Sequence, residues 1–131
     1  MAKGKILVID DEEDVREVVR LHLEKGGFNV IEATDGMEGI ALLKSGDNLL
    51  NVGAILCDIR MPKINGVEAI EVFKNEAAGI PVIVVTGYPD AELAVSLLKK
   101  GVRDYLVKPV DREKLLEVVE GAVMAGKEFD F

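Results

Sequence analysis

Residues 6–11 read Ile6-Leu7-Val8-Ile9-Asp10-Asp11, four apolar residues followed directly by two carboxylates. A short run that is apolar at every position, and not alternately polar, is typical of a strand covered on both faces of a parallel sheet. The next residues, 14–25, have apolar side chains at helical spacing and end at Gly26-Gly27, which predicts a helix and its C-terminus. The chain therefore opens with a predicted β–α unit.

The same alternation recurs four more times along the chain. The predicted strands are residues 6–9, 29–33, 52–57, 81–85 and 105–107, and the predicted helices are residues 14–25, 36–44, 66–75, 91–100 and 111 to about 125. Successive βα units predict an α/β fold, here the flavodoxin-like (βα)5 three-layer sandwich with a parallel five-stranded sheet of order 2-1-3-4-5. With 131 residues and no linker, we expect a single domain over 1–131, with a core of about 5–125 and a short tail, 126–131.

The composition argues against several classes of function. The 24 acidic residues outnumber the 16 basic ones, giving a net charge of −8, which disfavours nucleic-acid binding by this domain and docking on anionic lipid. No segment approaches the roughly 20 consecutive apolar residues that a membrane-spanning helix needs. The single cysteine excludes an internal disulfide and a cysteine-based zinc site, so we expect a reducing, cytoplasmic location.

Polar residues follow four of the five predicted strands. They are Asp10 and Asp11 after the first, Asp58 after the third, Thr86 (followed by Gly87) after the fourth, and Lys108 (followed by Pro109) after the fifth. Because ligands of such sheets bind at the carboxyl ends of the strands, we expect these residues around one crevice. Three adjacent carboxylates resist joint ionisation, and a hard cation such as Mg²⁺ relieves their repulsion. A carboxylate there can attack phosphorus to give an acyl phosphate, while Mg²⁺ and Lys108 neutralise the charge.

These motifs resemble those of response-regulator receiver domains of two-component signalling. The resemblance lies in residues 7–11, in Asp-Ile-Arg-Met-Pro at 58–62 followed by Gly66, in Val-Val-Thr-Gly at 84–87, and in residues 101–109, and it covers about residues 5–125. It implies a phosphorylation-activated switch and not a metabolic enzyme, since such a domain catalyses only its own phosphorylation and dephosphorylation. The implied phosphodonor is a sensor histidine kinase or a histidine phosphotransfer protein.

The resemblance also implies a role for each residue of the site. Asp58 is the expected phosphorylation site, and Lys108 contacts the phosphoryl group. Asp11 binds Mg²⁺ directly and Asp10 binds it largely through water, with Asp58 and the backbone carbonyl of Arg60 as the further ligands. The cofactor implied by these assignments is Mg²⁺.

Further implied roles concern the switch and the surroundings of the phosphoryl group. Thr86 and Tyr105 are the expected switch pair, and they change the surface formed by the fourth helix (91–100), the fifth strand and the fifth helix. Gly87, Tyr88 and Pro109 neighbour the phosphoryl pocket, with a cis bond before the proline. Our hypothesis is that Tyr88 and Arg60 hinder water and prolong the phosphorylated state.

Two other functions remain open from the residues alone. A Mg²⁺-dependent phosphatase of the haloacid-dehalogenase type would need a second Asp two residues after its nucleophile, but Arg60 follows Asp58 and Glu12 follows Asp10. A binding module that uses the fold without phosphorylation is disfavoured because all five expected site residues are present. No effector region follows residue 125, so we expect an unknown output protein, or an output domain of a longer regulator.

Overall fold

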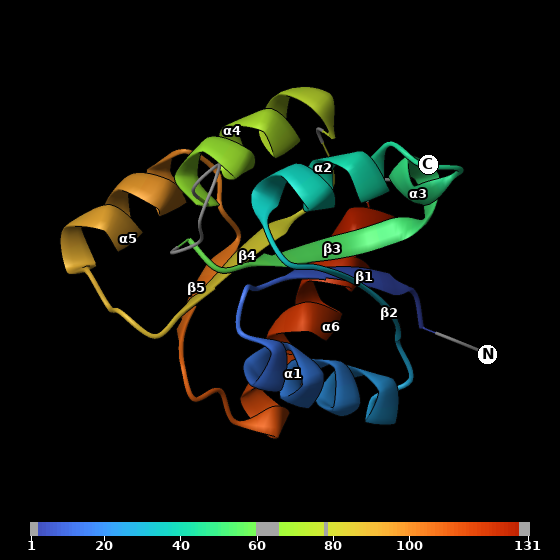
Figure 1. Ribbon diagram of the computed structural model, residues 1–131, viewed down its shortest axis with the longest axis horizontal. Coiled ribbons are helices and arrows are strands. Elements are labelled where there is room, and N and C mark those ends of the chain that lie inside the picture. The colour runs from blue at the N-terminus through green and yellow to red at the C-terminus, as the bar shows by residue number, and fades with distance from the viewer. Residues whose placement is uncertain (1–2, 60–65, 78, 129–131) are drawn as a thin grey trace.

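The chain forms a parallel sheet between two layers of helices in a computed structural model, which describes residues 3–59, 66–77 and 79–128 (Figure 1). The strands are β1 (Lys5–Ile9), β2 (Asn29–Ala33), β3 (Val52–Cys57), β4 (Val82–Thr86) and β5 (Asp104–Val107). The helices are α1 (Glu13–Lys25), α2 (Gly36–Leu43), α3 (Asn48–Asn51), α4 (Gly66–Glu76), α5 (Ala91–Lys99) and α6 (Arg112–Glu128). Every predicted strand and helix is present, with boundaries that differ by a few residues at most.

The sheet has the predicted order, β2-β1-β3-β4-β5, and all neighbouring strands are parallel. In β1, which lies between β2 and β3, Ile9 lies opposite Ala33 of β2 and opposite Cys57 of β3. This register brings the C-terminal ends of the inner strands level with one another. The residues that follow these strands therefore emerge along one edge of the sheet.

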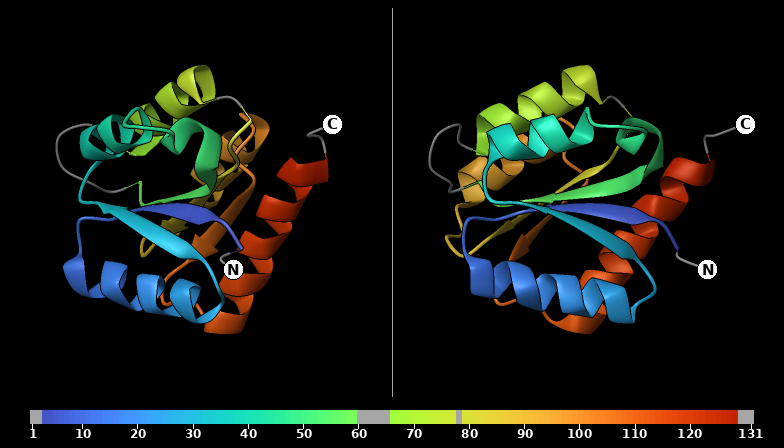
Figure 2. Two further views of the ribbon diagram at one scale, coloured as in Figure 1. Left: turned by 90° about the vertical axis from the view of Figure 1, so that its right-hand side faces the viewer. Right: turned by 45° about the vertical axis from the view of Figure 1, so that its right-hand side comes forward.

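Helices cover both faces of the sheet, with α1 and α6 on one face and α2, α4 and α5 on the other (Figures 1 and 2). Successive residues of β1 point alternately into the two hydrophobic cores, one on each face of the sheet. Ile6 and Val8 pack with the side chains of α1 and α6, whereas Leu7 and Ile9 pack with Phe73 and the opposite layer. Each such side chain stabilises the fold by about 1.5–3 kcal/mol when it is fully buried. A strand buried on both faces explains why the sequence is apolar at every position of 6–9.

Two helical segments differ from the sequence prediction. The single turn of α3 was not predicted, because none of its residues is buried and it leaves no apolar period in the sequence. It is held by the side-chain amide of Asn48, which donates to the Leu42 carbonyl oxygen at 2.6 Å. Helix α6 continues to Glu128, past Gly126, because a glycine inside a helix costs only about 1 kcal/mol.

Asp111 caps the N-terminal end of α6. Its carboxylate accepts a hydrogen bond from the Lys114 amide at 3.2 Å, which satisfies one of the backbone donors left unpaired at a helix start. The cap fixes where the chain turns after β5 and hence the position of the β5–α6 loop beside the sheet edge.

None of the described helices has both the length and the apolar character that crossing a lipid bilayer requires.

Candidate functional site

Backbone hydrogen bonds continue the sheet by one residue past the ends of its strands. The Asp10 amide donates to the Ala33 carbonyl oxygen at 3.1 Å, and the Asp58 amide donates to the Ile9 carbonyl oxygen at 3.0 Å. The Lys108 amide is held in the same way, at 2.8 Å from the carbonyl oxygen of the last residue of β4. The three charged residues that the sequence placed after separate strands are therefore fixed side by side by the sheet itself.

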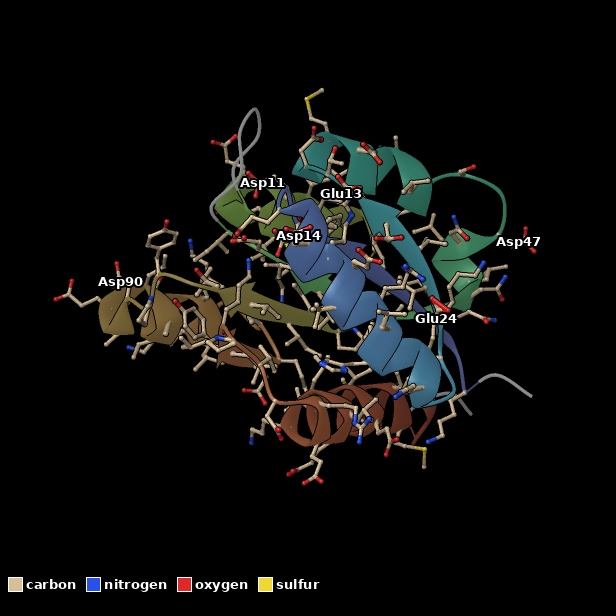
Figure 3. All side chains as sticks on the ribbon, turned by 60° about the horizontal axis from the view of Figure 1, so that its bottom comes forward. Asp11, Glu13, Asp14, Glu24, Asp47 and Asp90 are labelled. Atoms are coloured by element: carbon tan, nitrogen blue, oxygen red, sulfur yellow. The ribbon has the colours of Figure 1, made fainter. Side chains whose placement is uncertain are left out.

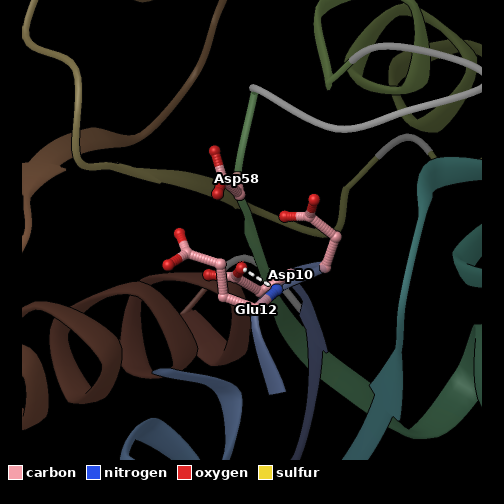
Figure 4. Close-up of side chains that lie close together, drawn as sticks. Asp10, Glu12 and Asp58 are labelled. Atoms are coloured by element: carbon pink, nitrogen blue, oxygen red, sulfur yellow. Dashed lines mark hydrogen bonds between the residues drawn. The ribbon is translucent and has the colours of Figure 1, made fainter. Parts of the chain in front are cut away.

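The Lys108 ammonium joins three carboxylates at this edge. Its Nζ lies 2.7 Å from Asp10 Oδ2, 2.9 Å from Asp58 Oδ2 and 3.3 Å from Glu12 Oε1. The carboxylates of Asp10, Glu12 and Asp58 converge in Figure 4 from the ends of β1 and β3. Asp10 and Asp58 are almost fully buried, whereas Glu12 is exposed. The site thus has a buried floor and an acidic rim open to solvent.

The carboxylates form a group that fits a divalent cation. One oxygen from each of Asp10, Asp11, Glu12 and Asp58 lies within 4.8 Å of the others. Lys108 supplies one positive charge against these four acidic groups, so the cluster keeps a net negative charge. Oxygen donors of this kind are the ligands that Mg²⁺ prefers. The predicted fourth contributor, the carbonyl of Arg60, lies outside the described residues.

Burial and charge act in opposite directions on the ionisable groups of the site. Burial raises the pKa of Asp10 above its ordinary value, and this effect outweighs the hydrogen bonds from Lys108 and Glu12 that lower it. For Lys108, burial lowers the pKa, but the hydrogen bonds to Asp10 and Asp58 more than compensate, so its pKa is raised. Lys108 is therefore protonated at neutral pH and can neutralise an anion bound beside Asp58.

The predicted switch residues lie on neighbouring strands. Thr86 ends β4 and is fully buried, and its Oγ1 accepts a hydrogen bond from the Tyr88 amide at 3.1 Å. Tyr105, on β5, packs against the core beneath α4 and α5. The Tyr105 hydroxyl is buried and finds no hydrogen-bond partner among the residues that the structure describes. The tyrosine thus already points inward, and its role in switching stays a prediction.

The predicted neighbours of the pocket lie around Lys108. The Lys108–Pro109 peptide bond is cis, as predicted. A Cβ on Gly87 would lie 3.9 Å from Lys108 Cδ, an ordinary contact, so space alone does not require glycine there. Tyr88 is 60% exposed and lines the same groove as Lys108.

Two residues at the site were not identified from the sequence. Glu12 entered the sequence analysis only as the residue two after Asp10, yet its carboxylate reaches Lys108. Its place directly after Asp10-Asp11 was the available signal. Arg16 was not singled out, yet its guanidinium donates to the Asp10 carbonyl oxygen at 2.7 Å. Arg16 lies in the first turn of α1, where its amide donates to the Glu12 carbonyl oxygen at 2.9 Å.

Comparisons with known proteins agree with this geometry. Residues 6–120 match the family model described as the response regulator receiver domain. The transcriptional regulatory protein FixJ of Bradyrhizobium diazoefficiens is 32% identical over 121 residues, which cover 92% of this chain and 57% of FixJ. The chain thus corresponds to little more than half of that relative.

Solved structures show the same similarity over the whole length of receiver domains. A response regulator receiver domain protein from Clostridium thermocellum superimposes with a TM-score of 0.88 at 30% identity, covering 95% of this chain and 98% of that one. A CheY-like receiver domain protein from Methanospirillum hungatei gives a TM-score of 0.87 at 29% identity, covering 95% and 97% of the two chains. The fold, the acidic edge of the sheet and the matched residues lead to one conclusion: this chain belongs to the response regulator receiver domain family.

Proposed function

We propose that this receiver domain is switched by a phosphoryl group that Asp58 accepts from a phosphohistidine. The supporting observation is the position of the Lys108 ammonium, 2.9 Å from Asp58 Oδ2 and inside a cluster of carboxylates. An ammonium there compensates the negative charge that a phosphoryl group would add. The phosphodonor would be a sensor histidine kinase or a histidine phosphotransfer protein.

The chemistry needs a nucleophile and charge compensation. An Asp58 oxygen attacks phosphorus, the P–N bond of the phosphohistidine breaks, and the imidazole nitrogen keeps the electron pair and takes up a proton. Lys108 is placed to pair with a phosphoryl oxygen, as it now pairs with Asp58. Mg²⁺, which Asp10, Asp11 and Asp58 would hold, supplies further positive charge to the phosphoryl oxygens when it is bound. Catalysis in this proposal is confined to phosphorylation and dephosphorylation of the domain itself.

A groove beside the site supports a macromolecular phosphodonor. It has a volume of about 560 Å³ and runs from Lys108 and Tyr88 along α1, where Val15, Val18 and Val19 line it. Half of the Val18 surface is exposed. An exposed apolar groove that reaches Lys108 suits a protein that docks and presents its phosphohistidine.

The proposed output surface lies across the sheet edge formed by β5. We propose that phosphorylation draws Thr86 toward the phosphoryl group and that Tyr105 follows, which alters α5, β5 and α6. Three exposed apolar side chains, Val95, Leu98 and Val107, lie on α5 and β5. Such a surface is suited to protein contact. The protein or domain that reads it is unknown.

Two further assignments complete the proposal. We propose that residues 1–131 are a single receiver domain, since the family match spans 6–120 and α6 continues to Glu128. We also propose a cytoplasmic location, where Cys57, a free and buried cysteine, would remain reduced.

Intact-mass measurement tests the phosphoacceptor. The protein is incubated with acetyl phosphate and Mg²⁺, and the expected result is one added phosphoryl group. Asp58→Asn keeps the size of the side chain but removes the nucleophile, so it should show no addition, and a chelator should give the same result. An addition that persists in Asp58→Asn would show that the phosphoacceptor is another residue. Phosphorylation of Asp58→Asn by a histidine kinase would do the same.

A further inference from the structure

Arg16 connects the acidic loop to two elements of the fold. Its Nη1 donates to the Asp10 carbonyl oxygen at 2.7 Å, and its Nε donates to Glu32 Oε1 on β2 at 3.1 Å. The Arg16 side chain is only 14% exposed although it is charged. A mostly buried guanidinium with two charge-assisted hydrogen bonds is fixed in one orientation, because its donors form a rigid planar fork.

The contact with Arg16 completes the fixation of Asp10. The Asp10 amide is bound to the Ala33 carbonyl, Oδ1 accepts from the Glu12 amide at 2.9 Å, and Oδ2 contacts the Lys108 ammonium. The Asp10 carbonyl is bound by Arg16. This carbonyl belongs to the peptide unit that joins Asp10 to the next residue, Asp11. Its orientation therefore sets the direction in which the Asp11 side chain leaves the backbone.

We propose that Arg16 is a positioning residue for the cation site, because it orients the Asp10–Asp11 peptide unit so that both carboxylates face the same point. This inference rests on the proposed binding of Mg²⁺ by these residues. Arg16 itself would contact neither the cation nor the phosphoryl group. It acts through the backbone of Asp10, as outer partners of metal ligands do.

The sign of the effect separates positioning from charge. Arg16 carries a positive charge close to the site, so its electrostatic field alone opposes the binding of a cation. Removal of that charge would tighten Mg²⁺ binding if charge were the whole effect. Weaker Mg²⁺ binding after the same change can come only from the loss of the correct geometry.

Arg20 provides a matched control on the same helix. It also pairs with Glu32, at 3.4 Å, and it bonds Glu24 at 2.9 Å, toward the C-terminal end of α1. Figure 3 shows α1 with Asp11 beside its N-terminal end and Glu24 near the other end. Among the described residues, Arg20 makes no hydrogen bond to the Asp10–Asp11 segment. Arg16→Met and Arg20→Met therefore remove the same charge from one helix, but only the first releases the Asp10 carbonyl.

The experiment measures the Kd for Mg²⁺ by titration calorimetry on the full chain, with the free energy of unfolding in chelator recorded separately for each variant. We expect the Kd to rise about tenfold or more in Arg16→Met, as for other outer partners of metal ligands. Arg20→Met should bind Mg²⁺ as tightly as wild type or slightly more tightly. Arg16→Lys keeps the charge but lacks the fork, so its Kd should lie between those of wild type and Arg16→Met.

Several outcomes would overturn the inference. Unchanged or tighter Mg²⁺ binding in Arg16→Met would show that the carbonyl contact does not position the site. An equal loss in Arg20→Met would point to a general effect of α1. If Arg16→Met does not fold, Arg16→Lys decides, and a wild-type Kd in that variant rejects the role of the fork. A wild type that binds no Mg²⁺ would overturn the proposed cation site itself, which the other outcomes leave intact.

Discussion

Lys108 Nζ lies 2.9 Å from Asp58 Oδ2, although 50 residues separate the two in the sequence. The contact is mostly removed from water, since 11% of the Lys108 side chain and 4% of the Asp58 side chain are exposed. The same ammonium also contacts Asp10 at 2.7 Å. Two buried carboxylates thus share the positive charge of Lys108. Both the stability of this edge and its proposed chemistry depend on that shared contact.

Lys108→Met should destabilise the protein when no metal is present. The substitution leaves Asp10 and Asp58 buried without their cation, and removing one partner of a buried pair costs about 3 kcal/mol or more. Urea unfolding in chelator measures this loss. Mg²⁺ should restore part of the stability, because it replaces the missing positive charge in the native state only.

Lys44→Met is the control for the loss of a lysine. Its ammonium pairs with Glu76 at 2.8 Å, but about half of each side chain is exposed. Such surface pairs contribute about 1 kcal/mol or less, so Lys44→Met should unfold close to wild type with or without Mg²⁺. A Lys108→Met protein as stable as Lys44→Met in chelator would contradict the dependence of the two carboxylates on Lys108.

Asp10 should make stability depend on pH in the opposite sense to an ordinary ion-paired carboxylate. Its pKa is raised by burial above the ordinary 3.8, so the native state binds the proton more tightly than the unfolded state does. The stability gained from this group is therefore full below the ordinary pKa and is lost as pH rises through the raised one. Wild type should lose stability relative to Asp10→Asn as pH rises from about 4 to 7.

Unfolding free energies of the two proteins, measured in chelator at several pH values, check the pH effect. The difference between them cancels the carboxylates that the proteins share. If wild type gained stability relative to Asp10→Asn with rising pH, hydrogen bonding and not burial would dominate at Asp10.

Tyr105→Phe should stabilise the protein slightly. The Tyr105 hydroxyl is buried and has no hydrogen-bond partner in the described part of the chain, and leaving such a group unpaired costs about 1–3 kcal/mol. Phenylalanine keeps the ring in the core and removes that cost, so the free energy of unfolding should rise by about 1 kcal/mol. Tyr105→Leu, which also alters the packing of the ring, should be less stable than Tyr105→Phe. A loss of stability in Tyr105→Phe would show that the hydroxyl has a partner in solution.

The sequence could predict the sheet and the floor of the site because both depend on local patterns. Asp58 and Lys108 stand directly after apolar strands, and the ends of parallel strands must meet. The contacts of Glu12 and Arg16 depend instead on the direction of their side chains around the start of α1, which an acidic helix start does not reveal. Helix α3 buries none of its residues, so it produced no hydrophobic period to detect.

Tyr88→Ala should shorten the life of the phosphorylated state. Tyr88 lines the groove that Lys108 also lines, and Lys108 contacts Asp58. We therefore expect the Tyr88 ring to hinder water that approaches a phosphoryl group on Asp58. Without the ring, hydrolysis should be a few-fold faster, as followed by loss of the phosphoryl mass after the donor is removed. Tyr88→Phe keeps the ring and should hydrolyse at the wild-type rate. An unchanged or slower rate in Tyr88→Ala would mean that water reaches the acyl phosphate by a path that this ring does not cover.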